Sequence, residues 1–362
     1  MSNSWFDRHP ALAASAISIA GAIMLLLSIE ALLRWFAPAI QFRNTDARLI
    51  AARSYSDTHG NARNFDGEVF GTAVRIDANG FRTNPGAQAA APAGPTIVFL
   101  GDSVTFGVGV ADGKTFVDLV RENTPHARVI NASSIGYFLQ SYENVVRTFI
   151  VPARERLQIS KVVLGICLND VNRVGAPEFA TNDAKDAYPS ASRQNADPAK
   201  RYSPIAVWVN ETFPAVNAYL RSHSKLYLLA RSVALDSGRA HLDAAIIVYE
   251  DPQVLKRSLE ALGSIASELR AAGIALDVLL FPYEYQLRTN APRTYLPQRV
   301  LAEFLSARKI RYFDLAEEFR AHMAASGTKA ADYYLFDDPM HLSELGHAVV
   351  QRFIAKNRIA DP

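Results

Sequence analysis

The sequence predicts an α/β fold, with a five-stranded parallel sheet covered by helices and one transmembrane helix in front of it. Two observations predict the sheet. Short apolar runs alternate with helical segments, and within each run the apolar residues are continuous, as expected of strands buried on both faces. A third observation predicts the transmembrane helix: residues 11–29, ALAASAISIAGAIMLLLSI, contain no charged residue.

The N-terminal apolar segment is long enough to cross a membrane, for which about 20 apolar residues suffice. The apolar core of a cleaved signal peptide is usually shorter, about 7–15 residues. A small-residue pattern at Ala37-Pro38-Ala39 is a weak cleavage site because of its proline. Residues 1–39 are therefore predicted to be an uncleaved single-pass membrane anchor, with Arg34 and Trp35 suited to the membrane interface.

A regular alternation of strands and helices begins near residue 96. The five predicted strands are residues 96–100, 127–132, 161–168, 274–281 and 310–316. Helices are predicted at residues 115–122 and 140–156, and behind an Asp251-Pro252 cap with a stop at Gly273. This pattern predicts one α/β domain over residues 96–357.

Two regions fall outside the alternation. Residues 40–95 are predicted to be an extended lead-in, with an Asn79-Gly80 hairpin signal and a Pro/Gly/Ala-rich linker at 84–95. Residues 171–240 form an insertion that is first polar and then apolar and aromatic. A lid or binding loop and a surface decoration both fit this insertion.

Several classes of function are excluded by simple counts. The glycine-rich turn after the first strand contains Gly107, Gly109 and Gly113-Lys114-Thr115, but both the P-loop and the dinucleotide spacings fail by one residue. The net charge of +2 does not point to nucleic acid. The single cysteine, Cys167, excludes an internal disulfide and fits a buried position. No histidine has ligand spacing, so no metal and no cofactor are predicted.

Polar residues gather where predicted strands end, and ligands bind at the carboxyl ends of parallel strands. Four blocks occur in order between about residues 96 and 350: Gly101-Asp102-Ser103, Gly136, Asn169-Asp170, and Asp338 followed three residues later by His341. In this order the blocks resemble the SGNH (GDSL) hydrolase family. One departure is Gly165, which stands further from the asparagine than the family's glycine and is left without a clear role.

The resemblance implies a flavodoxin-like three-layer sandwich and a serine-hydrolase site that needs no cofactor. Ser103 would be the nucleophile, His341 the general base and Asp338 the carboxylate that orients the histidine. The oxyanion hole would comprise the backbone N–H groups of Ser103 and Gly136 and the side-chain amide of Asn169.

Four other residues are weaker candidates for these roles. His347 is a second possible base, but Glu344 rather than aspartate stands three residues before it. Asp337 stands one residue before Asp338 and is therefore one residue out of the family's Asp-x-x-His spacing. Asp102 and Asp170 are more typical of residues that bond to the backbone of their own turns.

The function implied is a serine esterase that hydrolyses acyl or acetyl esters through an acyl-enzyme, on a small molecule or on cell-surface carbohydrate. An O-acyltransferase that moves the acyl group to a polysaccharide hydroxyl shares this chemistry. A catalytically silent carbohydrate-binding or scaffold protein is an alternative of another class, although it would not need the complete set of Ser103, Asn169, Asp338 and His341.

The membrane orientation follows from two opposing observations. Arg8 precedes the apolar segment and four arginines follow it, Arg34, Arg43, Arg48 and Arg53, which by the positive-inside rule places the catalytic domain in the cytoplasm. The family resemblance places anchored members at the bacterial cell surface, and long domains translocate largely regardless of charge. We therefore expect a bacterial inner-membrane protein with residues 40–362 outside the cytoplasm.

Overall fold

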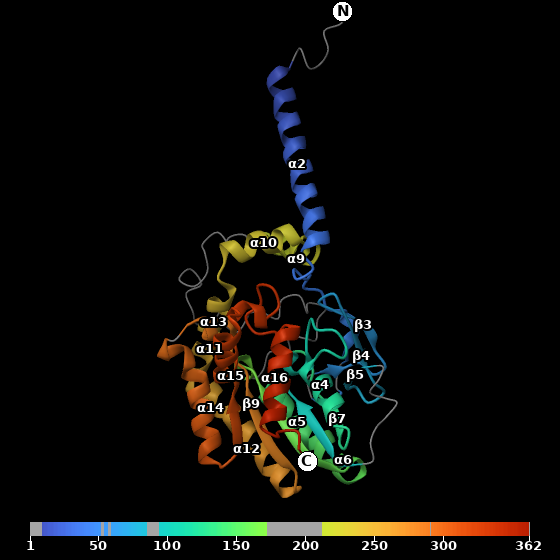
Figure 1. The fold of residues 1–362 in the computed structure, drawn as a ribbon, viewed down its shortest axis with the longest axis vertical. Coiled ribbons are helices and arrows are strands. Elements are labelled where there is room, and N and C mark those ends of the chain that lie inside the picture. The colour runs from blue at the N-terminus through green and yellow to red at the C-terminus, as the bar shows by residue number, and fades with distance from the viewer. Residues whose placement is uncertain are drawn as a thin grey trace, which may run out of the picture.

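The computed structural model describes residues 9–51, 54–56, 59–84, 94–171, 212–289 and 291–361. Its centre is an eight-stranded sheet with the order β10-β9-β8-β6-β7-β5-β4-β3 (Figure 1). Helices α4 (Phe116–Asn123) and α16 (Glu344–Lys356) pack together on the sheet, as do α5 (Leu139–Val145) and α12 (Pro252–Ala271). Most of the predicted linker and the polar half of the predicted insertion lie outside the described residues.

All five predicted parallel strands are present. Their order across the sheet, with the strands counted along the chain, is 2-1-3-4-5, the flavodoxin-like arrangement. Every residue of the first of them is buried, as its continuous apolar run predicts. The strands are β6 (Thr96–Leu100), β7 (Arg128–Asn131), β8 (Ile159–Ile166), β9 (Ala275–Leu280) and β10 (Arg311–Asp314).

The predicted helices form where capping residues and apolar periodicity place them. Asp251 accepts hydrogen bonds from the first backbone N–H groups of α12, and Gly273, with φ +66°, follows the end of that helix. Helix α5 continues through one π-helical turn (Val146–Ile150) into α6 (Val151–Leu157). The remaining long helices of the domain are α11 (Ser237–Tyr249), α14 (Leu296–Ala307) and α15 (Leu315–Ser326).

The segment predicted as an extended lead-in is part of the sheet. Strands β3 (Asp66–Val69), β4 (Thr72–Ile76) and β5 (Arg82–Thr83) are antiparallel and extend the sheet beyond β7. The hairpin between β4 and β5 turns at Gly80, whose φ of +90° agrees with the predicted turn. Two further strands, β1 (Ile50–Ala51) and β2 (Gly60–Asn61), form a separate small sheet.

A long apolar helix, α2 (Pro10–Phe36), projects away from the body of the protein (Figure 1). Its 27 residues correspond to a length of about 40 Å at 1.5 Å per residue. Among the described residues it is the one helix that is long and apolar enough to cross a membrane, and most of its side chains are exposed.

Candidate active site

The position of Ser103 is set by a tight turn between β6 and the short helix α3 (Ser103–Phe106). Asp102 caps this helix, accepting a hydrogen bond from the backbone N–H of Val104 at 2.9 Å. A Cβ atom on Gly101 would lie 2.2 Å from Thr105 Oγ1, so only glycine fits there. A Cβ on Gly165 of β8 would meet the same hydroxyl at 2.2 Å, which gives Gly165 a packing role beneath the serine turn.

The late Asp-x-x-His block lies in a loop closed by its own backbone. Leu335 N–H donates to the His341 carbonyl at 2.9 Å. Oδ1 of Asp338 accepts the backbone N–H groups of Met340 at 2.9 Å and His341 at 2.8 Å. Three residues of separation thus bring the carboxylate back beside its histidine.

Ser103, His341 and Asp338 form one hydrogen-bonded chain from parts of the sequence more than 230 residues apart. Ser103 Oγ lies 2.9 Å from His341 Nε2, and His341 Nδ1 lies 2.9 Å from Asp338 Oδ2. An ionised carboxylate can only accept, so Nδ1 carries the proton and Nε2 accepts from the serine hydroxyl. All three side chains are buried.

The charge on Asp338 is stabilised by its surroundings. Burial would raise the pKa of Asp338, but attraction to His341 and Arg43 and the hydrogen bonds from His341 outweigh it and hold that pKa well below its usual range. Arg43 forms an ion pair with Asp338 Oδ2 and also donates to the Phe336 carbonyl at 2.8 Å. In the sequence, Arg43 is one of the charges that flank the membrane segment, and nothing near it in the chain indicates this contact.

The chain between the anchor and β3 covers the histidine side of the site. Phe70, which lies between β3 and β4, packs edge-on to the His341 ring at a centroid distance of 5.8 Å, and Arg43 lies over the Phe70 ring. Gln41 donates to the Gly109 carbonyl in the loop after Ser103, at 3.2 Å. The segment that follows the anchor is therefore bonded to both the serine loop and the Asp338 loop.

Replacing Arg43 with glutamine is expected to lower the unfolding free energy at neutral pH by about 1–3 kcal/mol, because Asp338 and the Phe336 carbonyl both lose a charged donor. The folded-state pKa of Asp338 is depressed, so its interactions stabilise the fold fully above the ordinary aspartate range and are lost as pH falls through the folded pKa. The difference between variant and wild type should therefore persist at pH 3 and shrink only where Asp338 itself becomes protonated in the folded state.

Denaturant unfolding of the full chain in detergent at pH 7 and pH 3 measures this difference. Arg48→Gln is the matched control, because Arg48 pairs with Asp46 on the exposed surface of the same segment and should matter little at either pH. An Arg43→Gln loss no larger than the Arg48→Gln loss at pH 7 would refute the assignment to Asp338.

Asn169 lies in the 3₁₀ turn η3 (Leu168–Asp170) that follows β8, on the same side as Ser103. Its Nδ2 is 3.5 Å from Asp102 Oδ2, and Ser103 Oγ is 3.3 Å from the same oxygen. Tyr283 O–H donates to Asn169 Oδ1 at 3.3 Å, which turns the amide N–H group toward the serine. Burial raises the pKa of Asp102, the direction that favours its neutral form.

Gly136 lies in the loop after β7, with a φ of +77° that favours glycine. This loop is tied to the serine turn, because Ser134 N–H donates to the Gly101 carbonyl at 3.3 Å. The structure thus places Gly136 in the loop that borders the turn of Ser103.

Three of the four weaker candidates for the triad roles, His347, Asp337 and Asp170, form hydrogen bonds with groups other than Ser103, His341 and Asp338. His347 Nδ1 accepts the Phe116 backbone N–H at 3.0 Å, and burial lowers the pKa of this histidine to about 3. Asp337 accepts from Ser237 Oγ at 2.7 Å. Asp170 accepts the Cys167 backbone N–H at 2.7 Å, and Cys167 is fully buried, as predicted.

The glycine-rich loop after Ser103 points its carbonyl oxygens, not its N–H groups, toward its centre. The fully buried guanidinium of Arg82 donates there to the carbonyls of Phe106 at 2.8 Å, Gly107 at 2.5 Å and Val110 at 2.6 Å. A phosphate cradle needs inward N–H donors. The loop therefore holds a cation of the protein itself, supplied by β5.

Arg82→Met is expected to lower the unfolding free energy by about 3–5 kcal/mol, because several buried carbonyl groups would lose their donor. Denaturant titration of the purified full chain measures the loss. Arg299→Met removes an exposed arginine and should change stability by less than about 0.5 kcal/mol. Equal stability of the two variants would show that the loop does not depend on Arg82.

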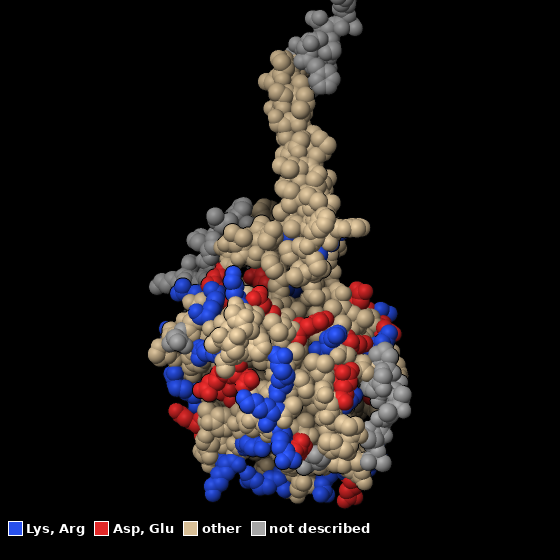
Figure 2. Space-filling view, in the orientation of Figure 1, with Lys and Arg blue, Asp and Glu red and all other residues tan. Residues whose placement is uncertain are grey.

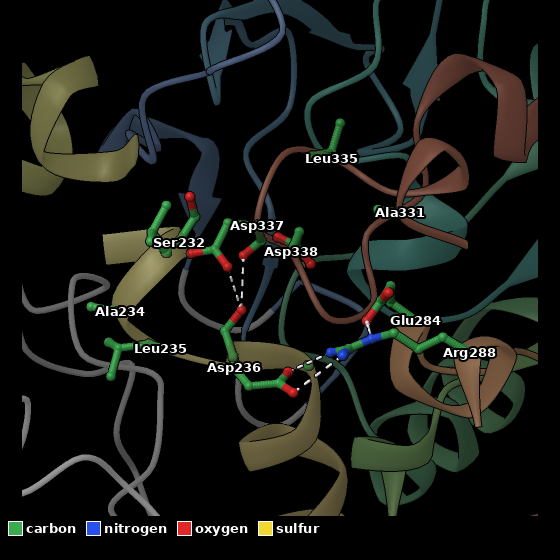
Figure 3. Close-up of a pocket in the computed structure, with 13 residues that line it drawn as sticks. Ser232, Ala234, Leu235, Asp236, Glu284, Arg288, Ala331, Leu335, Asp337 and Asp338 are labelled. Carbon is green, nitrogen blue, oxygen red and sulfur yellow. Dashed lines mark hydrogen bonds and ion pairs between the residues drawn. The ribbon is translucent and has the colours of Figure 1, made fainter. Parts of the chain in front are cut away.

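A cavity of about 310 Å³ lies on the Asp338 side of the site (Figure 3). Its wall is largely polar, with Arg288 bridging Asp236 and Glu284. Residues 232–238 form the opposite wall. Among the described residues no group of His, Cys, Asp or Glu is arranged to hold a metal ion.

No protein-family profile matches the chain, and no curated protein matches it either. Among solved structures, it is similar to a member of the lipolytic protein G-D-S-L family from Veillonella parvula, at 11% identity and a TM-score of 0.37, covering 72% of this chain and 97% of that one. It is also similar to an acetylxylan esterase from Geobacillus stearothermophilus, at 15% identity and a TM-score of 0.41, covering 74% and 95%. A lipase/acylhydrolase from Enterococcus faecalis matches at 15% identity and a TM-score of 0.38, covering 73% and 96%.

Proposed function

We propose that the chain is a membrane-anchored serine esterase of the SGNH type, which cleaves acyl or acetyl esters through an acyl-enzyme. The observation that carries the proposal is the continuous hydrogen-bonded chain from Ser103 through His341 to Asp338. A serine hydroxyl is a weak nucleophile until a base removes its proton, and this arrangement supplies the base and its orienting carboxylate.

In the proposed reaction, Ser103 Oγ attacks the ester carbonyl while its proton moves to His341 Nε2. Asp338 stabilises the imidazolium that forms, and Arg43 keeps Asp338 ionised. The tetrahedral intermediate collapses, and the proton on His341 passes to the departing alcohol. Water then attacks the acyl-enzyme with His341 as base, which releases the carboxylic acid and restores Ser103.

The oxyanion is proposed to accept hydrogen bonds from the Ser103 and Gly136 backbone N–H groups and from Asn169 Nδ2. The orientation of Asn169 supports its part in this set, since the Tyr283 hydroxyl occupies the amide oxygen and leaves the N–H group toward the serine turn. Each such donor is typically worth about 10²–10³ in rate.

Transfer of the acyl group to a carbohydrate hydroxyl is a second candidate, because the polar cavity beside Asp338 offers carboxylates and a guanidinium to a polyol. An assay of the full chain in detergent on 4-nitrophenyl acetate, with and without an oligosaccharide acceptor, separates the possibilities. Release of nitrophenol and acetate indicates an esterase, and acetylated oligosaccharide indicates a transferase. No turnover under either condition would refute both and leave the silent binding protein.

We propose further that α2 remains attached as the anchor. Glu30 near its end accepts hydrogen bonds from Ser224 Oγ at 2.9 Å and from the backbone N–H groups of Lys225 at 3.1 Å and Leu226 at 2.9 Å. Removal of the N-terminal segment would take this acceptor away from the folded domain. A discarded signal sequence has no need of such contacts.

Fusions to the C-terminus test the proposed extracytoplasmic placement of residues 40–362. Alkaline phosphatase, which requires export, is expected to be active, and green fluorescent protein, which generally stays dark after export in unfolded form, is expected to be dark. The physical reason is that a large domain translocates largely regardless of the arginines that flank its anchor. The reverse pattern would place the site in the cytoplasm and exclude surface polysaccharide as substrate.

A further inference from the structure

We propose that α9 (Pro214–His223) and α10 (Lys225–Ala234) form a membrane-docking surface, and that the cavity beside Asp338 opens next to it toward the lipid headgroups. The substrate class that follows, resting on the ester chemistry proposed above, is an amphiphilic ester whose apolar part stays in the bilayer. The two helices lie across the base of α2, between the anchor and the catalytic body (Figure 1).

The height of the docking surface is set by the anchor. The uncharged residues 11–29 correspond to about 28 Å of helix, close to the roughly 30 Å thickness of the hydrocarbon core. Glu30 therefore lies at the boundary of that core, and it is Glu30 that accepts the N–H groups at the start of α10. Lys225 Nζ donates to the Ala37 carbonyl at 2.7 Å, and Arg34 donates to the His223 carbonyl at 2.5 Å. These contacts fix α10 at the level of the headgroups.

The residue composition of the docking surface suits contact with lipid headgroups. Apolar side chains of the α9–α10 region are exposed to solvent in the isolated protein: Phe213 by 45%, Val216 by 53%, Tyr219 by 62% and Val233 by 84%. Residues 212–235 contain no Asp or Glu, so the segment carries no charge that would repel anionic headgroups. Figure 2 shows this junction largely free of acidic atoms, whereas acidic and basic side chains crowd much of the body.

The docking surface borders the cavity beside Asp338. Residues 232–238, at the end of α10 and the start of α11, form one wall of the cavity whose other wall includes Asp338 (Figure 3). Arg231 of α10 pairs with Asp337 at 3.2 Å, next to Asp338. Val233 both lines the cavity and is exposed, so a ligand at the membrane surface can enter beside it.

The anchor ends only a few positions before a residue that contacts the candidate site. Arg43, which contacts Asp338, stands seven positions after Phe36, the last residue of α2. Seven residues span at most about 25 Å when fully extended. The site therefore lies no further beyond the end of the anchor than this span plus the reach of the Arg43 side chain.

Nitroxide labels on introduced cysteines test the docking surface in the full chain, reconstituted in phosphatidylethanolamine/phosphatidylglycerol nanodiscs. The native Cys167 is fully buried and does not compete for the label. A label at Val233→Cys is expected to collide readily with oxygen and to be shielded from a water-soluble nickel chelate. Arg156→Cys, an exposed position on α6 at the far end of the body (Figure 1), should show the opposite pattern. Equal exposure of both labels to the nickel chelate would overturn the proposal.

The double variant Val216→Glu/Tyr219→Glu tests the substrate class while the anchor stays intact. The ratio of kcat/KM for 4-nitrophenyl palmitate embedded in the nanodisc to that for soluble 4-nitrophenyl acetate is expected to fall at least tenfold. An unchanged ratio would refute the link between docking and substrate. If wild type cleaves neither ester, the proposed esterase function fails, while the nitroxide measurement still decides whether α9 and α10 lie on the membrane.

Discussion

Ser103→Ala is expected to abolish ester hydrolysis, with a fall in kcat on the order of 10⁶-fold, because nucleophile and base act as one unit. The variant retains the backbone N–H of residue 103, so binding and part of the oxyanion hole remain. Its residual rate should therefore still exceed the uncatalysed rate, by about 10³–10⁴. Steady-state turnover of a short-chain ester by the full chain in detergent measures the loss.

Ser133→Ala is the matched control for this substitution. Ser133 is an equally buried serine in the loop after β7, outside the hydrogen-bonded chain of Ser103, His341 and Asp338. Its variant should retain activity close to that of wild type. Comparable activity of Ser103→Ala and wild type would eliminate Ser103 as nucleophile.

Asn169→Ala is expected to lower kcat by about 10²–10³-fold while KM changes little, because the proposed hydrogen bond strengthens only when the oxyanion develops. Tyr283→Phe removes the hydroxyl that orients the amide and leaves the amide itself, so a smaller fall in kcat is expected. Michaelis profiles of both variants on one ester provide the comparison. An Asn169→Ala effect confined to KM would make Asn169 a substrate-binding residue instead.

The five parallel strands are predictable from sequence because each is a continuous apolar run. Such a run is expected to be buried whichever strands become its neighbours. The lead-in strands are different. β5 has only two residues, and one of them is the charged and fully buried Arg82. Its pairing with β7 and its contacts with the loop after Ser103 exist only in the folded chain, so local sequence predicts an extended segment and no more.

The residues of the candidate site also divide into those that local sequence predicts and those that it does not. Ser103, Asn169 and the Asp338–His341 pair could be proposed because parallel strands end at one edge and because the pair is local in sequence. Arg43 and Tyr283 could not, since their partners Asp338 and Asn169 lie 295 and 114 positions away. Nor does sequence indicate that a charged residue at the end of the apolar segment, Glu30, caps a helix of the insertion.

The central claim is that Ser103, activated by His341, forms a covalent bond with an acyl substrate. The most direct test treats the full chain with a fluorophosphonate, which reacts with activated serines, and maps the adduct by mass spectrometry of the digested protein. We predict one adduct, on Ser103, in wild type and in Ser133→Ala, and none in Ser103→Ala or His341→Ala. An adduct that persists in Ser103→Ala, or wild type that remains unmodified, would contradict the account.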